Sequence, residues 1–354
     1  MDQFFSNLGL WIGYYLKPVR EWLLVPGDPG HKIMLMIVAI LIFVVVMGGI
    51  LLLVDRPKNV PQWVVTTAFA GPALLALAFG LVYPALRTVY ASFFNRNGRE
   101  YVGFDNYVQS FTQSEFQIVL RNTALWVLLV PTLATFIGLV YAVLVDRTRF
   151  ERIAKSLVFF PMAISMVGAG IIWRFMYDFR GVLLDANGNV RNNQTGLINQ
   201  VLVWFGQEPQ QFLINSPLNT LFLIVVMIWI QAGFAMTILS AAIKAIPDDI
   251  VEAARIDGLH GFGMFRYITV PSIRPALVVV LTTIAMATLK VFDVVRTMTG
   301  GNFSTSVVAN EFYRQSFVQG NAGLGAALAV ILFVLVIPIV VYNVRQMRLV
   351  EEIR

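Results

Sequence analysis

The stretch IMLMIVAILIFVVVMGGILLLV, residues 33–54, runs for 22 residues without a charged side chain. A helix that crosses a bilayer needs about 20 predominantly apolar residues, because the hydrocarbon core is about 30 Å thick and a helix rises about 1.5 Å per residue. Hydrophobic residues make up 58% of the chain and charged residues only 13%, which disfavours a large soluble all-helical protein. The sequence therefore predicts an all-α polytopic membrane protein. The seven candidate spans are 33–54, 63–86, 122–144, 157–177, 219–243, 276–298 and 322–343.

Positive charges gather in three segments that fall on one side of the membrane if the seven spans are correct. Since Lys and Arg are enriched in cytoplasmic loops, this side is predicted to be the cytoplasm, with the C-terminus inside and the N-terminus outside. Lys17, Arg20 and Lys32 would then be external; if one of the first two apolar segments were not a span, the N-terminus would be inside. The charged residues of the three segments are Arg147, Arg149, Arg152 and Lys155; Arg255, Arg266 and Arg274; and Arg345, Arg348 and Arg354.

Within residues 1–32, the stretch LGLWIGYYLKPVREWLLV is too short and too interrupted by charge to cross a membrane. Trp11, Tyr15 and Trp22 favour a helix that lies at the lipid interface, with a disordered tail as the alternative. The net charge of +6 is scattered over short loops, so no nucleic-acid partner is expected. The chain has no cysteine, which excludes disulfides and Cys-based metal sites, and no metal site is expected. Three longer segments, 87–121, 178–218 and 299–321, are predicted to be external.

The segment 246–275 is polar and lies between two candidate spans on the predicted cytoplasmic side. Pro247 suits the first position of a helix, and Asp248 and Asp249 carry the negative charge that a helix N-terminus favours. Gly258 supplies a C-terminal stop. A second short helix is predicted around Phe262, Phe265 and Thr269, with Pro271 and Pro275 ending it. The residues expected on one face of the first helix are Ile250, Ala253, Ala254 and Asp257.

This segment, EAARIDGLHGFGMFRYITVPSIRP, resembles the EAA loop of the membrane subunits of binding-protein-dependent ABC importers. The resemblance implies a coupling helix that docks on an ATPase subunit, with Glu252 making a charged contact there. It also implies two ATPase subunits, a second homologous permease, an extracytoplasmic sugar-binding protein, and a bacterial inner membrane. The residues assigned to ATPase coupling are Pro247, Asp249, Glu252, Ala253, Ala254, Asp257, Gly258, Phe265 and Pro271.

Three further stretches, IKAIPDD, YVGFDNYVQSF and DVVRTMTGGNFST, resemble the carbohydrate permeases of the maltose and α-glucoside type. The resemblance covers residues 63–350 and implies a six-helix permease core. The span and linker at 33–62 are extra to that core, and they follow the interfacial segment 1–32. The implied function is import of an α-glucoside, maltose-like or related sugar.

Polar residues inside spans are costly and mark functional sites. Trp229 and Gln231 lie near mid-membrane in one span, and Lys290 and Asp293, at i and i+3, are expected to share a face of the next. An aromatic ring and hydrogen-bonding groups together suit a sugar. The alternatives are a structural Lys290–Asp293 ion pair and a packing role for Trp229. Aligned on the family, Met162, Met166 and Met227 also fall near substrate positions, although methionines in spans are often filler.

No G-x-x-x-x-G-K-[ST] phosphate loop occurs, so ATP and Mg²⁺ are expected to bind to a partner subunit and this chain to be non-catalytic. An ion-coupled secondary transporter is the main alternative, but it predicts more buried acids than Asp293 and a repeat between halves. An intramembrane enzyme needs a nucleophile or a metal pair within the spans. Both histidines lie outside the spans, and no H-E-x-x-H or G-x-S-x-G motif occurs.

Overall fold

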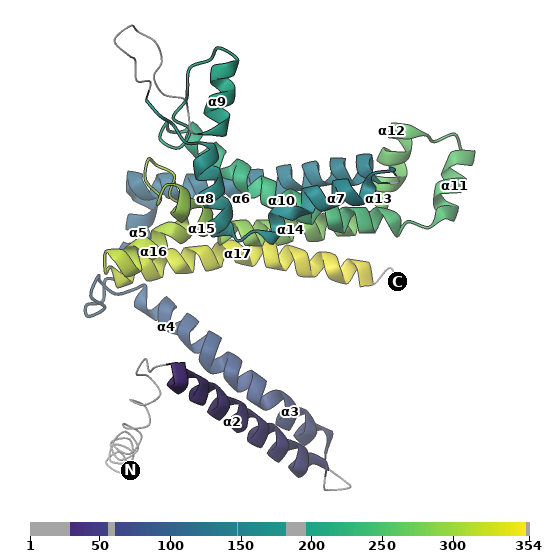
Figure 1. The fold of residues 1–354 in the computed structure, drawn as a ribbon. Helices are drawn as coiled ribbons and strands as arrows, with labels where there is room; N and C mark the ends of the chain where they lie inside the picture. The colour runs from purple at the N-terminus through teal and green to yellow at the C-terminus, as the bar shows by residue number, and fades with distance from the viewer. Residues whose placement is uncertain (1–28, 56–60, 147, 182–195, 352–354) are drawn as a thin grey trace, which may run out of the picture. The chain divides into compact units, whose positions relative to one another are not determined.

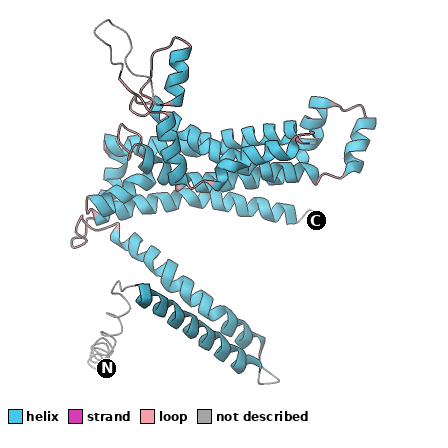
Figure 2. Ribbon diagram, viewed as in Figure 1, coloured by secondary structure: helices cyan, strands magenta, loops and turns pink. Residues whose placement is uncertain are grey.

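The computed structural model describes residues 29–55, 61–146, 148–181 and 196–351 (Figure 1). Within these ranges the chain is helical, and β pairing is limited to an isolated bridge between Phe94 and Tyr101 (Figure 2). Five helices are long and apolar enough to cross a membrane, or up to seven if each bent helix pair is one span. The prediction of an all-α polytopic fold is therefore confirmed. The segment expected at the lipid interface, residues 1–32, lies outside the described ranges up to residue 28, and residues 29–32 form the start of the first apolar helix.

The chain divides into two compact units, residues 1–85 and 86–354. In the first unit, α2 (Pro29–Asp55) packs against α3 (Gln62–Leu77), which continues through a π-helical turn, η1 (Ala78–Val82), into α4 (Tyr83–Ala91). Neither candidate span of this unit buries any of its most apolar window. A helix that is apolar on all sides and unburied is typical of one that faces lipid.

The second unit is built on a close pair of long helices, α6 (Ser114–Val145) and α10 (Leu218–Lys244). A Cβ on Gly138 would lie 2.5 Å from the Cβ of Ala235 and 2.7 Å from the backbone nitrogen of Met236. Gly138 lies on one face of α6 with Ala134 and Ala142, both fully buried. This stripe of small residues at intervals of four lets the two backbones approach, as is common between membrane helices.

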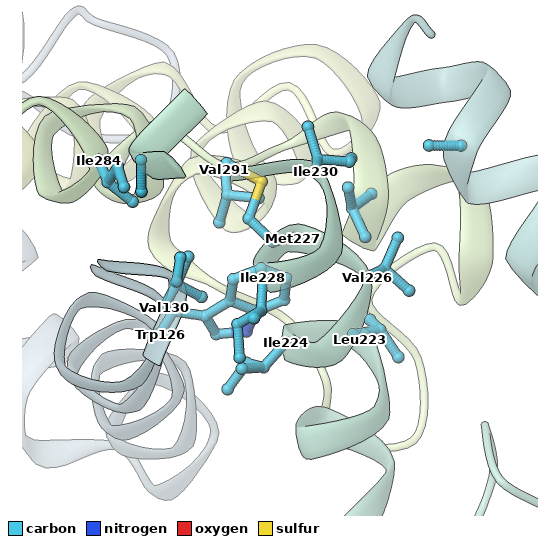
Figure 3. Close-up of a cluster of buried hydrophobic side chains, with 14 of the residues drawn as sticks. Trp126, Val130, Leu223, Ile224, Val226, Met227, Ile228, Ile230, Ile284 and Val291 are labelled. Carbon is cyan, nitrogen blue, oxygen red and sulfur yellow. The ribbon is translucent and has the colours of Figure 1, made fainter. Parts of the chain in front are cut away.

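Large apolar side chains fill the space beside this contact. Trp126 and Val130 from α6 meet Leu223, Met227 and their neighbours from α10, and Val291 closes the cluster (Figure 3). The helix α14 (Arg274–Leu289) packs against α6, and α17 (Ala322–Glu351) packs against α14. The core thus joins the spans that precede and follow the loop at 246–275.

Two of the predicted spans are not single straight helices. The segment predicted at 157–177 consists of α7 (Glu151–Phe159), a 3₁₀ turn η2 (Phe160–Ala163) and α8 (Met166–Met176), with a bend of 102°. The segment predicted at 276–298 is divided into α14 and α15 (Asp293–Met298). Pro161 and the extended Ser165 account for the first break, because proline cannot donate to the preceding helical turn.

The predicted external segments contain more helix than their polarity indicated. The helix α6 begins at Ser114, eight residues before the predicted start of the span at 122. Its first turns carry charged residues but also bury Phe116 and Val119 in an apolar cluster with Val308 and Leu324. The remaining short helices are α5 (Asp105–Thr112), α9 (Leu197–Trp204), α16 (Val308–Tyr313) and the π-helical turn η4 (Arg314–Val318).

Candidate functional site

The segment 246–275 forms a helix–turn–helix excursion at the end of α10. Its first helix, α11 (Asp248–Ile256), starts after Pro247, which is the N-cap and so lies one position before the predicted helical start. The helix ends in a Schellman motif: the Leu259 N–H donates to the Ala254 carbonyl at 2.9 Å, and the Gly258 N–H donates to the Arg255 carbonyl at 3.0 Å. Gly258 has φ +85°, a conformation that other residues adopt only with strain.

The surface of α11 is open on the side that carries the predicted coupling residues. Asp249, Glu252, Ala253 and Asp257 are exposed, and of this helix only Ala254 is buried. Within the described ranges, no hydrogen bond or ion pair engages the Glu252 carboxylate. The side chain of Ile256 is 87% exposed, an unusual state for an apolar residue at the end of a helix. The excursion therefore presents a thin, partly apolar helix with a free carboxylate to a partner.

The second helix of the excursion differs from the prediction in one respect. It runs through α12 (Gly261–Met264), a π-helical turn η3 (Phe265–Thr269) and α13 (Val270–Ser272), so Pro271 lies inside helical structure and does not end it. The chain then bends by 69° into α14. Phe265 is half-buried and, with Phe262, faces an apolar cavity of about 450 Å³ beside α6.

An ion-pair cluster lies at the same end of the bundle. Lys155 Nζ lies 2.6 Å from Glu151 Oε1 and 3.4 Å from Asp146 Oδ1, and it also bonds Ser240 Oγ. Lys244, in the last turn of α10, pairs with the same two carboxylates, at 3.3 Å from Asp146. The cluster ties the connector between α6 and α7 to the helix that leads into α11.

The two helix breaks lie on neighbouring elements. The helices α8 and α15, each just beyond a break, pack together so closely that a Cβ on Gly170 would lie 3.1 Å from the Cβ of Thr297. The 3₁₀ turn η2 packs against α10. Irregular backbone at membrane depth occurs where it is buried in protein or lines a water-filled cavity, and broken helices form the solute sites of many transporters.

Lys290 and Asp293 flank the second break and do not share a helical face as expected. Lys290 is the C-cap of α14 and is exposed, whereas Asp293 starts α15 and is half-buried. No ion pair joins them within the part of the chain that the structure describes, and neither has another hydrogen-bonding partner there. The expectation of one shared face is wrong, because the helix stops between the two residues.

The other predicted substrate residues fall into two groups. Trp229 and Gln231 are half-buried on α10, and the Trp229 ring meets the Trp173 ring edge to face at 5.6 Å. Met162 lies exposed in η2, and Met166 is the first residue of α8. Met227 differs from the prediction: it is fully buried in the apolar core, so in this conformation its side chain is closed to a solute.

A loop at the opposite end of the bundle from α11 was not predicted as a site. Phe303 and Ser304 have φ of 56° and 62°, the left-handed region that non-glycine residues rarely adopt. Buried asparagines hold them: Asn219 Nδ2 donates to the Phe303 carbonyl and Asn122 Nδ2 to the Ser304 carbonyl, both at 2.7 Å. The sequence signal here is the stretch DVVRTMTGGNFST, which resembles the carbohydrate permeases, but the backbone strain is visible only in the fold.

Two small polar cavities flank this loop, and Phe303 lines both. One, of about 240 Å³, includes Glu115, Asn302 and Arg314; the other, of about 230 Å³, includes Arg174 and Gln211. Burial alone would lower the pKa of Arg314, but the hydrogen bond to Glu115 and the charges of Glu311 and Glu115 outweigh it and raise the pKa above its ordinary value. Glu311, itself fully buried, lies 3.0 Å from Arg314 Nε.

Curated relatives share most of the chain. The osmoprotective compounds uptake permease protein GgtC of Synechocystis sp. is 44% identical over 81% of this chain and 100% of its own length. The α-glucoside transport system permease protein AglF of Rhizobium meliloti is 45% identical over 78% of this chain and 81% of its own length. A more distant relative, the trehalose/maltose transport system permease protein MalF of Thermococcus litoralis, is 28% identical over 75% of this chain and 88% of its own length.

The fold has a solved counterpart. A chain of a bacterial alginate ABC transporter, crystallised with an alginate pentasaccharide-bound periplasmic protein, superposes with a TM-score of 0.66 at 23% identity. The match covers 80% of this chain and 93% of that one, and at this identity the likeness concerns the fold alone. Residues 114–348 match the sequence pattern of binding-protein-dependent transport system inner membrane components. With two relatives above 40% identity over most of its length, this chain belongs to that family of inner membrane transport components.

Proposed function

We propose that this chain is the permease half of an ABC importer that moves a neutral α-glucoside-class sugar into the cytoplasm. The observation that carries the proposal is the 45% identity, over 78% of the chain, with the α-glucoside permease of Rhizobium meliloti. The second permease, two ATPase subunits that bind ATP and Mg²⁺, and an extracytoplasmic sugar-binding protein complete the system. The C-terminus and α11 then lie in the cytoplasm.

The exposed face of α11 supports docking on the ATPase. Ala253 leaves the helix thin, and Glu252 offers a carboxylate that has no partner in the described ranges. A carboxylate that is free before docking can pair with a basic group of the ATPase without breaking a bond within this chain. ATP-driven closure of the ATPase pair would move α11 and, through the ion-pair cluster, the ends of α6, α7 and α10.

The broken helices support a sugar path through the second unit. Trp229 offers an aromatic face, while Gln231, Lys290 and Asp293 offer groups that can bond hydroxyls; Met162 and Met166 line the approach at the first break. Charged groups without partners at a helix break mark a polar path more than a packing role.

The test is purification of the whole complex with Glu252→Ala, followed by ATPase activity with liganded binding protein. Removing one partner of a charge pair at a docked interface costs about 2–5 kcal/mol of binding free energy. The amount of ATPase that co-purifies with the permease, and the ATPase activity stimulated by the binding protein, should therefore fall at least about tenfold. The stability of the permease itself should stay within about 0.5 kcal/mol, because Glu252 is exposed and unpartnered. The variant Gly258→Pro cannot adopt φ +85°, so it should also lower ATPase recovery and the ATPase activity stimulated by the binding protein.

The matched control is Glu208→Ala, an exposed glutamate in the loop that follows α9. It should leave ATPase recovery unchanged. If the wild type binds no ATPase and takes up sugar on an ion gradient alone, the proposal is wrong. Equal ATPase recovery with Glu252→Ala and Glu208→Ala would place the coupling contact elsewhere.

A further inference from the structure

The loop that carries Phe303 is held in a strained shape by the two central helices. Asn122 is 1% exposed and belongs to α6, and its amide donates to both the Ser304 and Ser306 carbonyls. Asn219, fully buried in the first turn of α10, donates to the Phe303 carbonyl. Thr299 and Thr305 add a hydroxyl pair at 2.6 Å. Strained backbone persists only where its surroundings enforce it, and it is concentrated at ligand clamps and other functional sites.

This arrangement leaves Phe303 half exposed at the border of two cavities. The side chain is 50% exposed, and no other aromatic ring contacts it within the described ranges. Here the backbone is strained while the ring remains available to something outside the chain.

Polar side chains line both of the cavities that Phe303 borders. In one cavity, Arg174 and Gln211 have side chains with no hydrogen-bonding partner in the described part of the chain. In the other, Arg314 pairs with both Glu115 and the buried Glu311, and Asn302 lies beside them. An aromatic face between amide, guanidinium and carboxylate groups suits a neutral polyhydroxylated ring, whose C–H face packs on the aromatic and whose hydroxyls bond the polar groups.

We infer that Phe303 and its two cavities form an outer sugar-binding site, distinct from the helix breaks, which holds a neutral saccharide of at least two rings. Phe303 lines both cavities, so neighbouring rings of one molecule occupy the two while Phe303 stacks on the saccharide. The inference rests on the proposed function and adds a point of recognition at the end of the bundle opposite α11. A sugar arriving there is selected before it reaches Lys290 and Asp293.

The test uses the complete transporter in liposomes, with its binding protein and a panel of maltose, maltotriose, trehalose and methyl α-glucoside. Phe303→Leu and Phe303→Tyr both keep a non-glycine residue at φ 56°, so the two variants bear the same backbone strain. They differ in that Tyr keeps an aromatic ring and Leu removes it. Phe303→Leu should lower uptake of the best di- or trisaccharide about fivefold, the effect of one lost ring contact, whereas Phe303→Tyr should stay close to wild type. Affinity of the loaded binding protein for the transporter should not change.

Arg174→Met provides a second variant, since this exposed side chain holds nothing together within the described chain. It should lower uptake of the same sugar while thermal stability stays at the wild-type value. Wild-type uptake with Phe303→Leu, or a loss of binding-protein affinity in that variant, overturns the inference; the latter would make the ring a protein contact. If wild type moves none of the four sugars, the proposed function fails first and the outer site falls with it.

Discussion

Lys290 and Asp293 stand on either side of the break between α14 and α15, and the structure separates two hypotheses about them. If they formed a structural ion pair, removing either charge would have most of the effect of removing both. Since no ion pair joins them in the described ranges, we expect each to act on the solute by itself. Lys290→Met and Asp293→Asn should each lower the rate of sugar uptake about tenfold, the effect of one hydrogen bond to a charged group.

The measurement is a double-mutant cycle on uptake rate. The two effects should add to within about 0.5 kcal/mol, because no shared bond couples them. Thermal unfolding of the purified complex serves as the control, and neither single variant should change it. A double variant no slower than the singles would restore the ion-pair hypothesis.

At the residue scale, the sequence predicted what depends on local chemistry. Gly258 could be assigned as a helix stop because only a left-handed residue completes that turn, and its φ of +85° agrees. Phe303 could not be found in the same way. Its strained backbone is held by Asn122 and Asn219, which belong to two helices far away in the sequence. A local sequence pattern cannot predict such long-range contacts.

The packing of α6 on α10 sets the next prediction. Gly138 has no room for a side chain, because an added Cβ would meet both Ala235 and the backbone of Met236. Gly138→Val should therefore push the two helices apart and destabilise the permease by about 1–3 kcal/mol, the usual effect of overpacking. Thermal denaturation in detergent would measure this as a lower melting temperature and a lower yield of intact complex.

Leu128→Val is the control for this experiment. It places the same β-branched residue on α6 at a residue that is 64% exposed. Leu→Val lowers helix propensity, whereas Gly→Val does not, so the control bears at least the propensity cost of Gly138→Val without its steric clash. Its melting temperature should stay near the wild-type value. Equal destabilisation by the two substitutions would show that the close contact contributes nothing.

At the element scale, hydropathy predicted where the spans lie but not where they break. The first break had a sequence signal, Pro161, but the segment around it is so apolar that it was predicted as one continuous span. The second had only a weak one: LKVFDVV contains neither proline nor glycine, and its Val, Phe and Asp residues are only moderately unfavourable in a helix, yet α14 ends there. The packing of α15 on α8 is a tertiary contact, and it is the feature that local propensity cannot anticipate.

At the scale of the whole molecule, the ion-pair cluster connects the coupling excursion to the rest of the bundle. Lys155→Met would remove one of the two lysines that pair with Asp146 and Glu151, and it would remove a hydrogen-bonding partner of the buried Ser240 hydroxyl. We expect a loss of about 1–2 kcal/mol in stability and fewer sugars moved per ATP hydrolysed. The difference from wild type should shrink at high salt, which screens partly exposed pairs.

Arg149→Met tests whether the effect is specific to the cluster. Arg149 is exposed in the same connector, so the overall charge change is identical, yet the residue takes no part in the cluster. Its stability should change by less than about 0.5 kcal/mol. If the amount of sugar transported per ATP hydrolysed falls equally in both variants, coupling depends on the net charge of this region and not on the ion-pair cluster.

The 27-residue helix α10 connects the Phe303 loop to the ion-pair cluster. Asn219 in its first turn donates to the Phe303 carbonyl, and Lys244 in its last turn belongs to the ion-pair cluster. At about 1.5 Å per residue the helix is roughly 40 Å long, so a tilt of only about 5° moves one end by about 3.5 Å relative to the other. Such a rod acts as a lever arm. A small rotation imposed beside the ATPase becomes a displacement comparable to a hydrogen-bond length at the outer loop, and nothing between the two ends has to change its fold.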